Sequence, residues 1–210
     1  MKIAIIGATG FVGSAILNEL ANRNHQITAI ARNPKNDENT AVKWEKADIN
    51  NVDELSKIIA GNDVIVNAFS AGWTNPNLYT DFLEGSKAIQ EAVKKSGVKR
   101  FITIGGGGSL FVAPNLQAVD TPDFPKEYYT GATAARDYLN IIREEKELDW
   151  AFFSPAFEMH QGITTGRTGK YRLGLENPVF DENQRSILSV EDLAVVIADE
   201  IETPKHHQVR

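Results

Sequence analysis

The sequence predicts an α/β protein built on a doubly wound parallel sheet. Short apolar runs typical of buried strands alternate with longer amphipathic stretches typical of helices through most of the chain. No internal repeat or low-complexity segment interrupts this alternation. With 210 residues, the chain is long enough for one domain with a sizeable core and too short for a full second domain. We therefore expect a single domain spanning residues 1–210.

The first strand leads into a glycine-rich turn and a helix. Residues 3–6 form an apolar run typical of a strand buried on both faces, and Gly7, Gly10 and Gly13 follow at intervals of three. Gly7 permits a tight turn, Gly10 lets backbone N–H groups approach a pyrophosphate, and Gly13 lets the helix pack closely on the strand. The helix N-terminus then faces the phosphates. The alternative is an ordinary strand-to-helix turn, which the position of the motif in the first unit of a long alternation disfavours.

The second strand, residues 26–31, is followed directly by Arg32. In dinucleotide-binding folds an acidic residue near this position binds the ribose hydroxyls of NAD, whereas an arginine accommodates the 2′-phosphate of NADP. Here the first acidic residue is Asp37. Because a guanidinium group offers a planar fork to phosphate, the sequence favours NADP(H) over NAD(H). The alternative is that Arg32 is a solvated loop charge.

Three more strand and helix pairs follow in order. Asp48, after the third strand, is interpreted as an N-cap, a turn residue, or a hydrogen-bond acceptor for adenine beside Ile49. Small residues at 68–72 follow the fourth strand, at the edge where such sheets bind ligands, and are expected to line the cofactor ribose. We expect strands at residues 42–45, 63–67 and 101–104 and helices at 52–59, 79–96 and 126–145.

Two long loops are predicted on the substrate side of the domain. Residues 105–108 are four consecutive glycines, and residues 110–125 contain three prolines and no clean periodicity. The glycines favour conformational freedom and close backbone approach, so this loop either covers a ligand or is a flexible surface loop. After a sixth strand at 149–153, residues 162–174 are polar and rich in glycine. We therefore assign 105–125 and 157–186 as substrate-side loops, with a small C-terminal substrate-side region, and expect a last helix beginning at Ser189.

Composition excludes several classes of function. The net charge is −6, and the one basic cluster, at residues 94–100, is interpreted as a solvated helix end and turn, so we expect no nucleic-acid partner. The absence of cysteine excludes disulfides and thiolate catalysis. His206 and His207 have no third ligand nearby, so no metal is expected. No apolar run approaches ~18 residues and the chain begins directly with a strand, which predicts a cytoplasmic protein without a membrane partner.

Five short motifs together give a resemblance to a known family. They resemble the atypical short-chain dehydrogenase/reductase proteins, and within these the group of NAD(P)H-binding proteins that includes NmrA-like regulators and biliverdin/flavin-reductase-like proteins. The similarity spans essentially the whole chain and implies a Rossmann-like fold. The motifs are GATGFVG at 7–13, ARN at 31–33, ADI at 47–49, DW at 149–150 with SP at 154–155, and VEDLA at 190–194.

The resemblance also implies which residues bind the cofactor. It assigns the turn from Gly7 to Gly13 to the pyrophosphate and Arg32 to the 2′-phosphate. The remaining assignments are Thr9, Gly10, Phe11 and Val12 to the pyrophosphate contacts, Asp48 and Ile49 to adenine, Ala68, Phe69 and Ser70 to the ribose, and Pro155 and Phe157 to the nicotinamide.

One departure from the family pattern changes the expected chemistry. The wider dehydrogenase family uses Tyr-x-x-x-Lys, in which the lysine lowers the tyrosine pKa. Here Ala132 follows Tyr128 by four residues and Thr133 follows Tyr129, so the lysine is missing. A phenol with a pKa of about 10 is a poor base at neutral pH, which disfavours alcohol oxidation. Hydride transfer to a flavin or quinone-like acceptor remains, with the proton from solvent or from Ser109, Tyr128 or Tyr129; the alternative for the two tyrosines is packing.

Two functions are consistent with these residues. The first is an NADPH-dependent reductase acting on a small flat acceptor, with the chemistry supplied by the cofactor. The second is a non-catalytic NADP(H)-binding sensor or regulator of the NmrA-like type. We favour the reductase, because residues 109–125 can form a lid over a substrate pocket. The expected partner is a small-molecule substrate, and the expected state is a monomer or homodimer.

Overall fold

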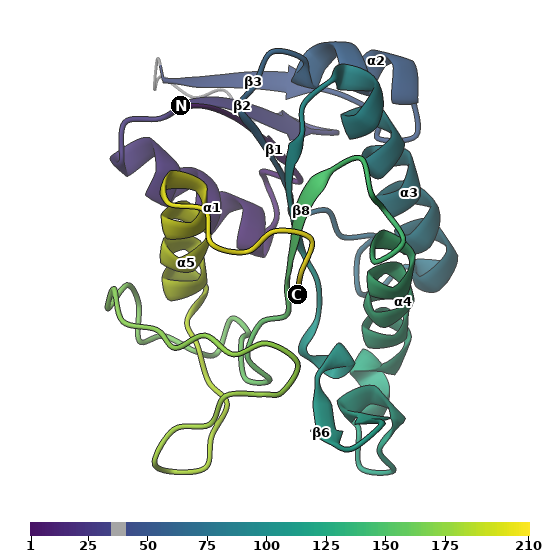
Figure 1. Cartoon of the computed structure of the whole chain (residues 1–210), viewed down its shortest axis with the longest axis vertical. Helices are drawn as coiled ribbons and strands as arrows, with labels where there is room; N and C mark the ends of the chain where they lie inside the picture. The colour runs from purple at the N-terminus through teal and green to yellow at the C-terminus, as the bar shows by residue number, and fades with distance from the viewer. Residues whose placement is uncertain (35–40) are drawn as a thin grey trace.

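The computed structural model describes residues 1–34 and 41–210 and is built around one six-stranded parallel sheet (Figure 1). The strand order is β3-β2-β1-β4-β5-β8, so the order reverses at β1, which lies between β2 and β4. This arrangement confirms the predicted fold class. The strands are β1 Lys2–Ile6, β2 Gln26–Ala31, β3 Val42–Lys46, β4 Val64–Asn67, β5 Arg100–Ile104 and β8 Asp149–Phe153.

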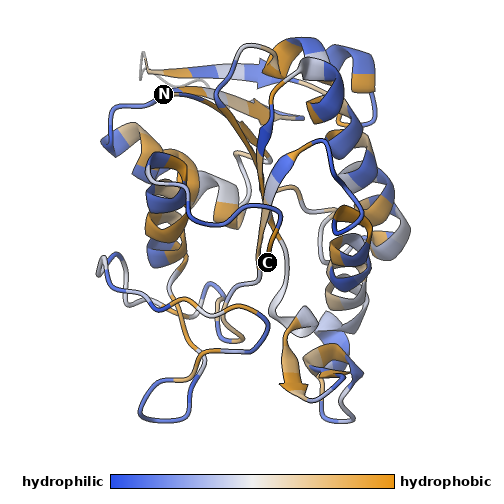
Figure 2. Ribbon diagram, in the orientation of Figure 1, coloured by the Kyte–Doolittle hydropathy of each residue, from blue (hydrophilic) through white to orange (hydrophobic). Residues whose placement is uncertain are grey.

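Helices cover both faces of the sheet (Figure 1). One face carries α1 (Phe11–Asn22) and α5 (Val190–Glu202), and the other carries α2 (Val52–Ile59), α3 (Leu78–Ser96) and α4 (Lys126–Ile142). Each face has its own core, because alternate residues of a strand point to opposite sides. Figure 2 shows the apolar strands between helices whose polar residues face outward.

Local sequence signals set several helix ends where they were expected. The Ser189 hydroxyl caps α5 by accepting a hydrogen bond from the Asp192 N–H at 3.1 Å. Gly97 ends α3 with a φ of +81°, a conformation that glycine adopts without strain. None of the helices in the described part of the chain is long and apolar enough to cross a membrane.

The loop after β5 differs from the prediction, because it is folded and packed. It contains two short 3₁₀ turns, Gly107–Ser109 and Ala118–Asp120, and a small hairpin of β6 (Phe111–Ala113) and β7 (Leu116–Gln117). A Cβ on Gly105 would lie 2.0 Å from the ring of Phe152, and one on Gly108 would lie 2.9 Å from the Ala132 methyl. The expectation that these glycines serve conformational freedom is therefore wrong. They allow close approach, and here the approaching groups are side chains of β8 and α4.

The basic cluster at 94–100 and the charged run at 143–147, which alternates in sign, are both expected to be solvated helix ends; Lys95 and Lys99 are exposed, but the expectation is wrong for Arg100 and for Glu145. Arg100 is buried, and its Nη2 lies 2.6 Å from Oε1 of Glu200 on α5. The side chains of this pair are 9% and 4% exposed. Similarly, α4 ends at Ile142 rather than at residue 145, and Glu145 is buried with its carbonyl accepting a hydrogen bond from Trp150 Nε1 at 3.2 Å. The partners of both charges are distant in sequence, because Arg100 pairs with α5 and the Glu145 carboxylate contacts Gln90 and Lys94 of α3.

Candidate cofactor site

The glycine turn between β1 and α1 is held by direct backbone contacts. Gly7 has a φ of +81°, and a Cβ there would lie 2.6 Å from the carbonyl oxygen of Ala68, which follows β4. A Cβ on Gly13 would lie 2.2 Å from the Gly7 oxygen. Around Gly10 the only described atom within 4 Å of such a Cβ is that same oxygen, at 3.3 Å. Gly7 and Gly13 are therefore required by packing, whereas a Cβ on Gly10 would meet a single described atom and is otherwise unobstructed.

The N-terminus of α1 is exposed beside this turn. Thr9, Gly10 and Phe11 are exposed and Val12 is half-buried. Within the described chain no side chain caps this helix end. Its first N–H groups lack intrahelical partners and carry the positive end of the helix dipole. This exposed, uncapped helix end beside Gly10 fits the pyrophosphate of a dinucleotide.

Arg32 lies at the carboxyl edge of the sheet, directly after β2. Its side chain is exposed, and no residue that the structure describes hydrogen-bonds or ion-pairs with it. Asp37, the first acidic residue after Arg32 in the sequence, lies outside the described residues. Within the described part of the chain, Arg32 is therefore a cation available to an anionic ligand group.

The residues predicted to hold adenine have different environments. Asp48 is exposed and forms a turn, in which its Oδ1 accepts hydrogen bonds from the Asn50 N–H at 3.0 Å and from the Asn50 side-chain amide at 3.2 Å. Asn51, not Asp48, caps α2. Ile49 is half-buried and converges with Phe69 at Gly85 of α3, since a Cβ on Gly85 would lie 2.7 Å from both side chains. Ile49 and Phe69 therefore form one apolar wall between the predicted adenine and ribose positions.

The loop after β4 is held by side-chain hydrogen bonds. Asn67 is buried, donates to Thr103 Oγ1 at 3.2 Å, and accepts a hydrogen bond from the Phe69 N–H at 3.0 Å. Ala68 packs its carbonyl on Gly7, and the exposed Ser70 accepts a hydrogen bond from the Gly72 N–H at 3.2 Å. Ala68, Phe69 and Ser70 are thus held next to the glycine turn.

The predicted nicotinamide residues lie beyond β5 and β8. A Cβ on Gly107 would lie 2.9 Å from the Pro155 carbonyl oxygen and 3.0 Å from the Phe157 ring, so both contact the glycine-rich loop. Phe157 is exposed and meets Phe180 edge-on, with 6.3 Å between ring centroids. The glycine-rich loop is thus in contact with the segment that follows β8.

The three predicted proton donors are not brought together. Ser109 is fully buried, where its hydroxyl donates to the Gly106 carbonyl at 2.9 Å and lies 3.1 Å from the Ser154 hydroxyl. Tyr128 and Tyr129, at the start of α4, are 47% and 50% exposed. The structure therefore gives Ser109 a packing and hydrogen-bonding environment, and leaves only the two phenols accessible from solvent.

Sequence reasoning missed the aromatic partner of Tyr128. Trp73, in the loop after β4, is 62% exposed and meets the Tyr128 ring edge-on at 5.5 Å. Gly131 makes room for it, since a Cβ there would lie 2.6 Å from the indole. The available signal was a tryptophan in a polar loop at the carboxyl end of a parallel strand.

Comparison with known proteins identifies the family to which this chain belongs. The family described as NAD(P)H-binding matches residues 7–204, from the glycine turn through α5. The chain belongs to this NAD(P)H-binding family. It is similar to the uncharacterized protein YwnB of Bacillus subtilis, with 34% identity over 100% of the chain and 96% of YwnB.

Solved structures of relatives share the whole fold. A protein from Bacteroides thetaiotaomicron, provisionally assigned as an epimerase, is 44% identical with a TM-score of 0.90, and the match covers 100% of this chain and 94% of that one. A provisionally assigned NADH-flavin reductase from Streptococcus pneumoniae is 31% identical with a TM-score of 0.86, covering 100% and 97%. A protein from Burkholderia pseudomallei, provisionally assigned as exported, is 37% identical with a TM-score of 0.87, covering 100% and 97%.

Membership of the NAD(P)H-binding family confirms the resemblance drawn from the short motifs. It makes the chain a Rossmann-like, oxidoreductase-type protein that binds a nicotinamide dinucleotide. The family does not distinguish NADP from NAD, and the names of the solved relatives include both a reductase and an epimerase. Specificity must therefore be argued from this chain's own residues.

Proposed function

We propose that this member of the NAD(P)H-binding family is an NADP(H)-dependent reductase that delivers hydride to a small flat acceptor such as a flavin or quinone. The observation that carries the cofactor preference is the exposed Arg32 side chain, which no described residue pairs with, directly after β2. A free guanidinium there attracts a 2′-phosphate and gives no comparable contact to a ribose hydroxyl. Bound NADPH would supply the hydride.

The residues around the glycine turn would hold this cofactor. The exposed N-terminus of α1 at Gly10 and Phe11 would bind the pyrophosphate, and Arg32 the 2′-phosphate. The apolar wall of Ile49 and Phe69 would lie against the adenosine half. The remaining proposed contacts are Thr9, Val12 and Gly13 at the pyrophosphate, Asp48 at adenine, Ala68 and Ser70 at the ribose, and Pro155 and Phe157 at the nicotinamide.

Exposed aromatic rings support a flat acceptor. Trp73 with Tyr128, and Phe157 with Phe180, form two exposed edge-on pairs. Trp73 lies in the loop after β4, Tyr128 in the first turn of α4, and Phe157 and Phe180 in the segment after β8. The carboxyl ends of parallel strands share one edge of the sheet, so both pairs lie on the side where such folds bind ligands. Ring faces of this kind stack on planar π systems. The name of the Streptococcus pneumoniae relative, an NADH-flavin reductase, supports the flavin class and names the other cofactor.

The absent lysine limits the reaction to acceptors that need little acid catalysis. Reduction of a flavin or quinone takes one hydride and one proton, and the proton can come from solvent or from an exposed phenol at Tyr128 or Tyr129. Oxidation of an alcohol instead requires a base to remove the hydroxyl proton. Neither tyrosine has the lysine four residues later that would lower its pKa for that role.

The test is a titration of the purified protein with NADPH and with NADH, followed by cofactor oxidation assays with FMN and with quinones. We expect Arg32→Gln to weaken NADPH binding about 10- to 100-fold and NADH binding less than about twofold, since a hydrogen bond to a charged group is worth about 1.5–3 kcal/mol. Lys99→Gln, an exposed cation at the opposite edge of the sheet, is the matched control. Equal wild-type affinity for both nucleotides would contradict the role of Arg32.

Turnover separates the reductase from the alternative function. Acceptor-dependent oxidation of NADPH supports the reductase. Tight NADPH binding without turnover on any acceptor supports a non-catalytic NADP(H) sensor instead. We further propose a cytoplasmic monomer or homodimer that acts on a small molecule, without nucleic-acid or membrane partners. Because the Burkholderia relative is described as exported, cell fractionation is the test of location.

A further inference from the structure

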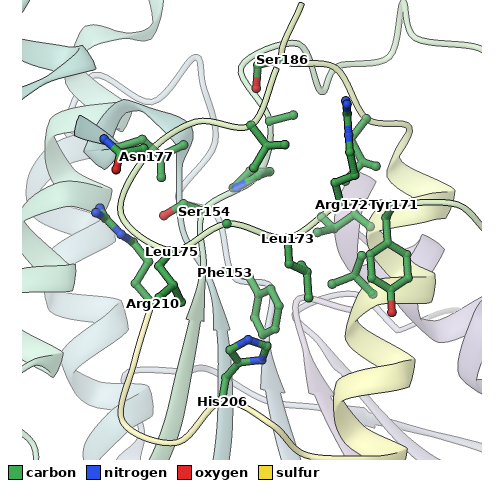
Figure 3. Close-up of a pocket in the computed structure, with 18 of the residues that line it drawn as sticks. Phe153, Ser154, Tyr171, Arg172, Leu173, Leu175, Asn177, Ser186, His206 and Arg210 are labelled. Carbon is green, nitrogen blue, oxygen red and sulfur yellow. The ribbon is translucent and has the colours of Figure 1, made fainter. Parts of the chain in front are cut away.

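A pocket of about 180 Å³ lies on the α5 side of β8, away from the glycine turn (Figure 3). The helices α1 and α5 pack over β1, β2 and β4 on this face of the sheet. Beside the edge strand β8, the covering layer is instead formed by residues 170–179 and by residues 206–210, which pair with β8 through Val209 and Ala151. Irregular segments pack less completely than a helix would, and the pocket lies beneath them.

The walls of this pocket are mainly apolar. Their size limits the ligand, because a cavity of about 150 Å³ is known to hold one benzene molecule. The pocket therefore has room for one aromatic ring or a short branched chain, and it is too small to enclose the three fused rings of a flavin. The main apolar side chains are Phe153, Leu173, Leu175, Leu193, Val196 and Val209.

The charged side chains that line the pocket are all basic. They are Lys170, Arg172 and Arg210, together with His206, and the described lining contains no aspartate or glutamate although the protein has a net charge of −6. No described residue hydrogen-bonds or ion-pairs with the side chain of Lys170 or of Arg172. Two free cations at an apolar pocket favour an anionic ligand.

The buried guanidinium of Arg210 adds a third positive charge. Its side chain is 1% exposed, and its Nη1 donates to the Ser109 carbonyl at 2.6 Å. Its Nη2 pairs with the Glu176 carboxylate, which also binds Arg143 at 3.0 Å. Two guanidinium groups, one buried and one partly exposed, thus share the Glu176 carboxylate beside the pocket. Burial lowers the pKa of Arg210.

Polar groups also differ between the two ends of the pocket. In Figure 3, Arg172 extends toward the end at Ser186, and His206 lies at the opposite end beneath the Phe153 ring. One ring nitrogen of His206 is occupied by Glu200, at 2.7 Å from Oε2, and the ring meets Phe153 edge-on at 6.3 Å. At the His206 end one imidazole nitrogen is already paired with a carboxylate and the surroundings are aromatic, whereas the Arg172 end offers a guanidinium that no described residue pairs with.

We propose that this pocket binds a small organic monocarboxylate whose apolar part is about the size of one aromatic ring. The ring lies among Phe153 and the leucines, and the carboxylate points to Lys170 and Arg172. A phosphate ester fits less well, because the apolar walls offer few N–H donors to a dianion. Pro155, which we place at the nicotinamide, also lines this pocket, so the pocket adjoins the proposed cofactor site. The proposal itself does not depend on the reductase activity.

The probe is benzoate, with benzamide as the neutral molecule of the same shape, titrated calorimetrically in saturating NADP⁺ so that the cofactor's own anion site is occupied. We expect saturable benzoate binding and at least about tenfold weaker benzamide binding. The double variant Lys170→Gln, Arg172→Gln should weaken benzoate at least about tenfold and leave benzamide unchanged. Lys99→Gln is the matched control and should change neither.

A second variant tests the pocket itself. Leu173 is half exposed, so Leu173→Trp can fill the pocket with little risk to folding, and it should abolish benzoate binding while thermal unfolding and NADPH titration stay as in the wild type. Wild-type protein without saturable benzoate binding, or with equal affinity for benzoate and benzamide, would overturn the proposal. So would a double variant or Leu173→Trp that binds benzoate as the wild type does. None of these results bears on Arg32, so the two proposals fail independently.

Discussion

The backbone of Gly13 packs directly on the carbonyl of Gly7: a Cβ on Gly13 would lie 2.2 Å from that oxygen. The first turn of α1 is therefore pressed against the end of β1, and the helix N-terminus is fixed beside the turn. This contact indicates that the three glycines have different roles. Gly13 and Gly7 hold the turn, and Gly10 lines the space where a phosphate would lie.

We expect Gly13→Ala to lower the free energy of unfolding by about 3 kcal/mol, because neither backbone can move away from the added methyl. Gly10→Ala should cost less than about 1 kcal/mol, since its φ of −74° suits alanine, yet it should weaken NADPH binding by crowding the phosphates. Urea unfolding and NADPH titration measure the two effects. Equal loss of stability in both variants would contradict this division.

A second pair of glycines tests the packing of the loop after β5. Gly105→Ala places a methyl 2.0 Å from the ring of Phe152, which is 2% exposed and cannot turn away, so we expect a loss of about 2 kcal/mol or more. Gly106→Ala is the matched control, because its Cβ would lie 3.5 Å from the Ala135 methyl in an extended backbone, and it should cost under about 1 kcal/mol. Urea unfolding of the two variants measures the loss of stability caused by each substitution.

The burial of Ser109 predicts different effects for the candidate proton donors. Ser109→Ala should lower stability by about 1 kcal/mol through lost hydrogen bonds, with turnover changed less than about twofold. Tyr128→Phe and Tyr129→Phe should each lower turnover by less than about tenfold without changing stability, because both phenols are exposed and solvent can also supply the proton. Steady-state kinetics with FMN and thermal unfolding measure both properties. Reduced turnover in a Ser109→Ala variant of normal stability would instead support Ser109 as a proton donor.

Asp192 ties residues 166–171 to the start of α5. Its Oδ1 accepts hydrogen bonds from the N–H groups of Thr168 and Gly169, each at 2.8 Å, and its Oδ2 accepts one from the Thr168 hydroxyl at 2.5 Å. Asp192→Ala removes all three, so we expect faster hydrogen exchange at 166–171 and about 2 kcal/mol lower stability. Asp192→Asn retains an oxygen for the two N–H groups and should have a smaller effect on exchange. Identical hydrogen-exchange rates at 166–171 in both variants would contradict this role of the Asp192 carboxylate.

The buried pair of Arg100 and Glu200 predicts acid sensitivity. Burial acts to raise the pKa of Glu200, but hydrogen bonds from the His206 ring and from the His206 and Lys205 N–H groups outweigh it and lower that pKa below its ordinary value of 4.5. A lowered carboxyl pKa stabilises the fold above pH of about 4.5, and this stabilisation is lost as the pH falls further. The free energy of unfolding should therefore drop as the pH falls from about 5 toward 3.

Glu200→Gln checks this assignment. The variant should start about 3 kcal/mol less stable, because Arg100 loses its buried counter-charge, and should then fall less steeply between pH of about 5 and 3. Glu91→Gln, on the exposed face of α3, is the control and should keep the wild-type slope. A Glu200→Gln slope equal to the wild-type slope would show that other carboxylates dominate the acid response.

Elements with local signals were predictable from the sequence. The second and sixth strands match at both ends, Ser189 and Gly97 mark helix ends as expected, and the glycine turn lies where its spacing indicated. Each of these depends on residues within a few positions of one another. The fold class follows from their order, because alternating strands and helices have few ways to bury their apolar faces.

Features that depend on distant residues were not predictable. Arg100 looked solvated because its partner Glu200 lies 100 residues away. The glycines at 105–108 looked mobile because the ring that packs on Gly105 comes from Phe152, on the neighbouring strand. The same limit applies to Trp73 and Tyr128, whose contact requires α4 to return to the loop after β4. Side-chain contacts between elements that are distant in sequence determine these positions. The order of residues along the chain does not show which of these contacts form.

The hydrogen bond from Arg210 to the Ser109 carbonyl spans 101 residues, and it has a consequence for synthesis on the ribosome. At about 5–20 residues per second, those 101 residues take roughly 5–20 s to be made. During that interval β1, β2 and β4 are already complete, so the glycine turn can form early in the nascent chain. The loop after β5 gains this last anchor only when residue 210 has emerged, so the nucleotide half of the protein can be assembled before the substrate half is closed.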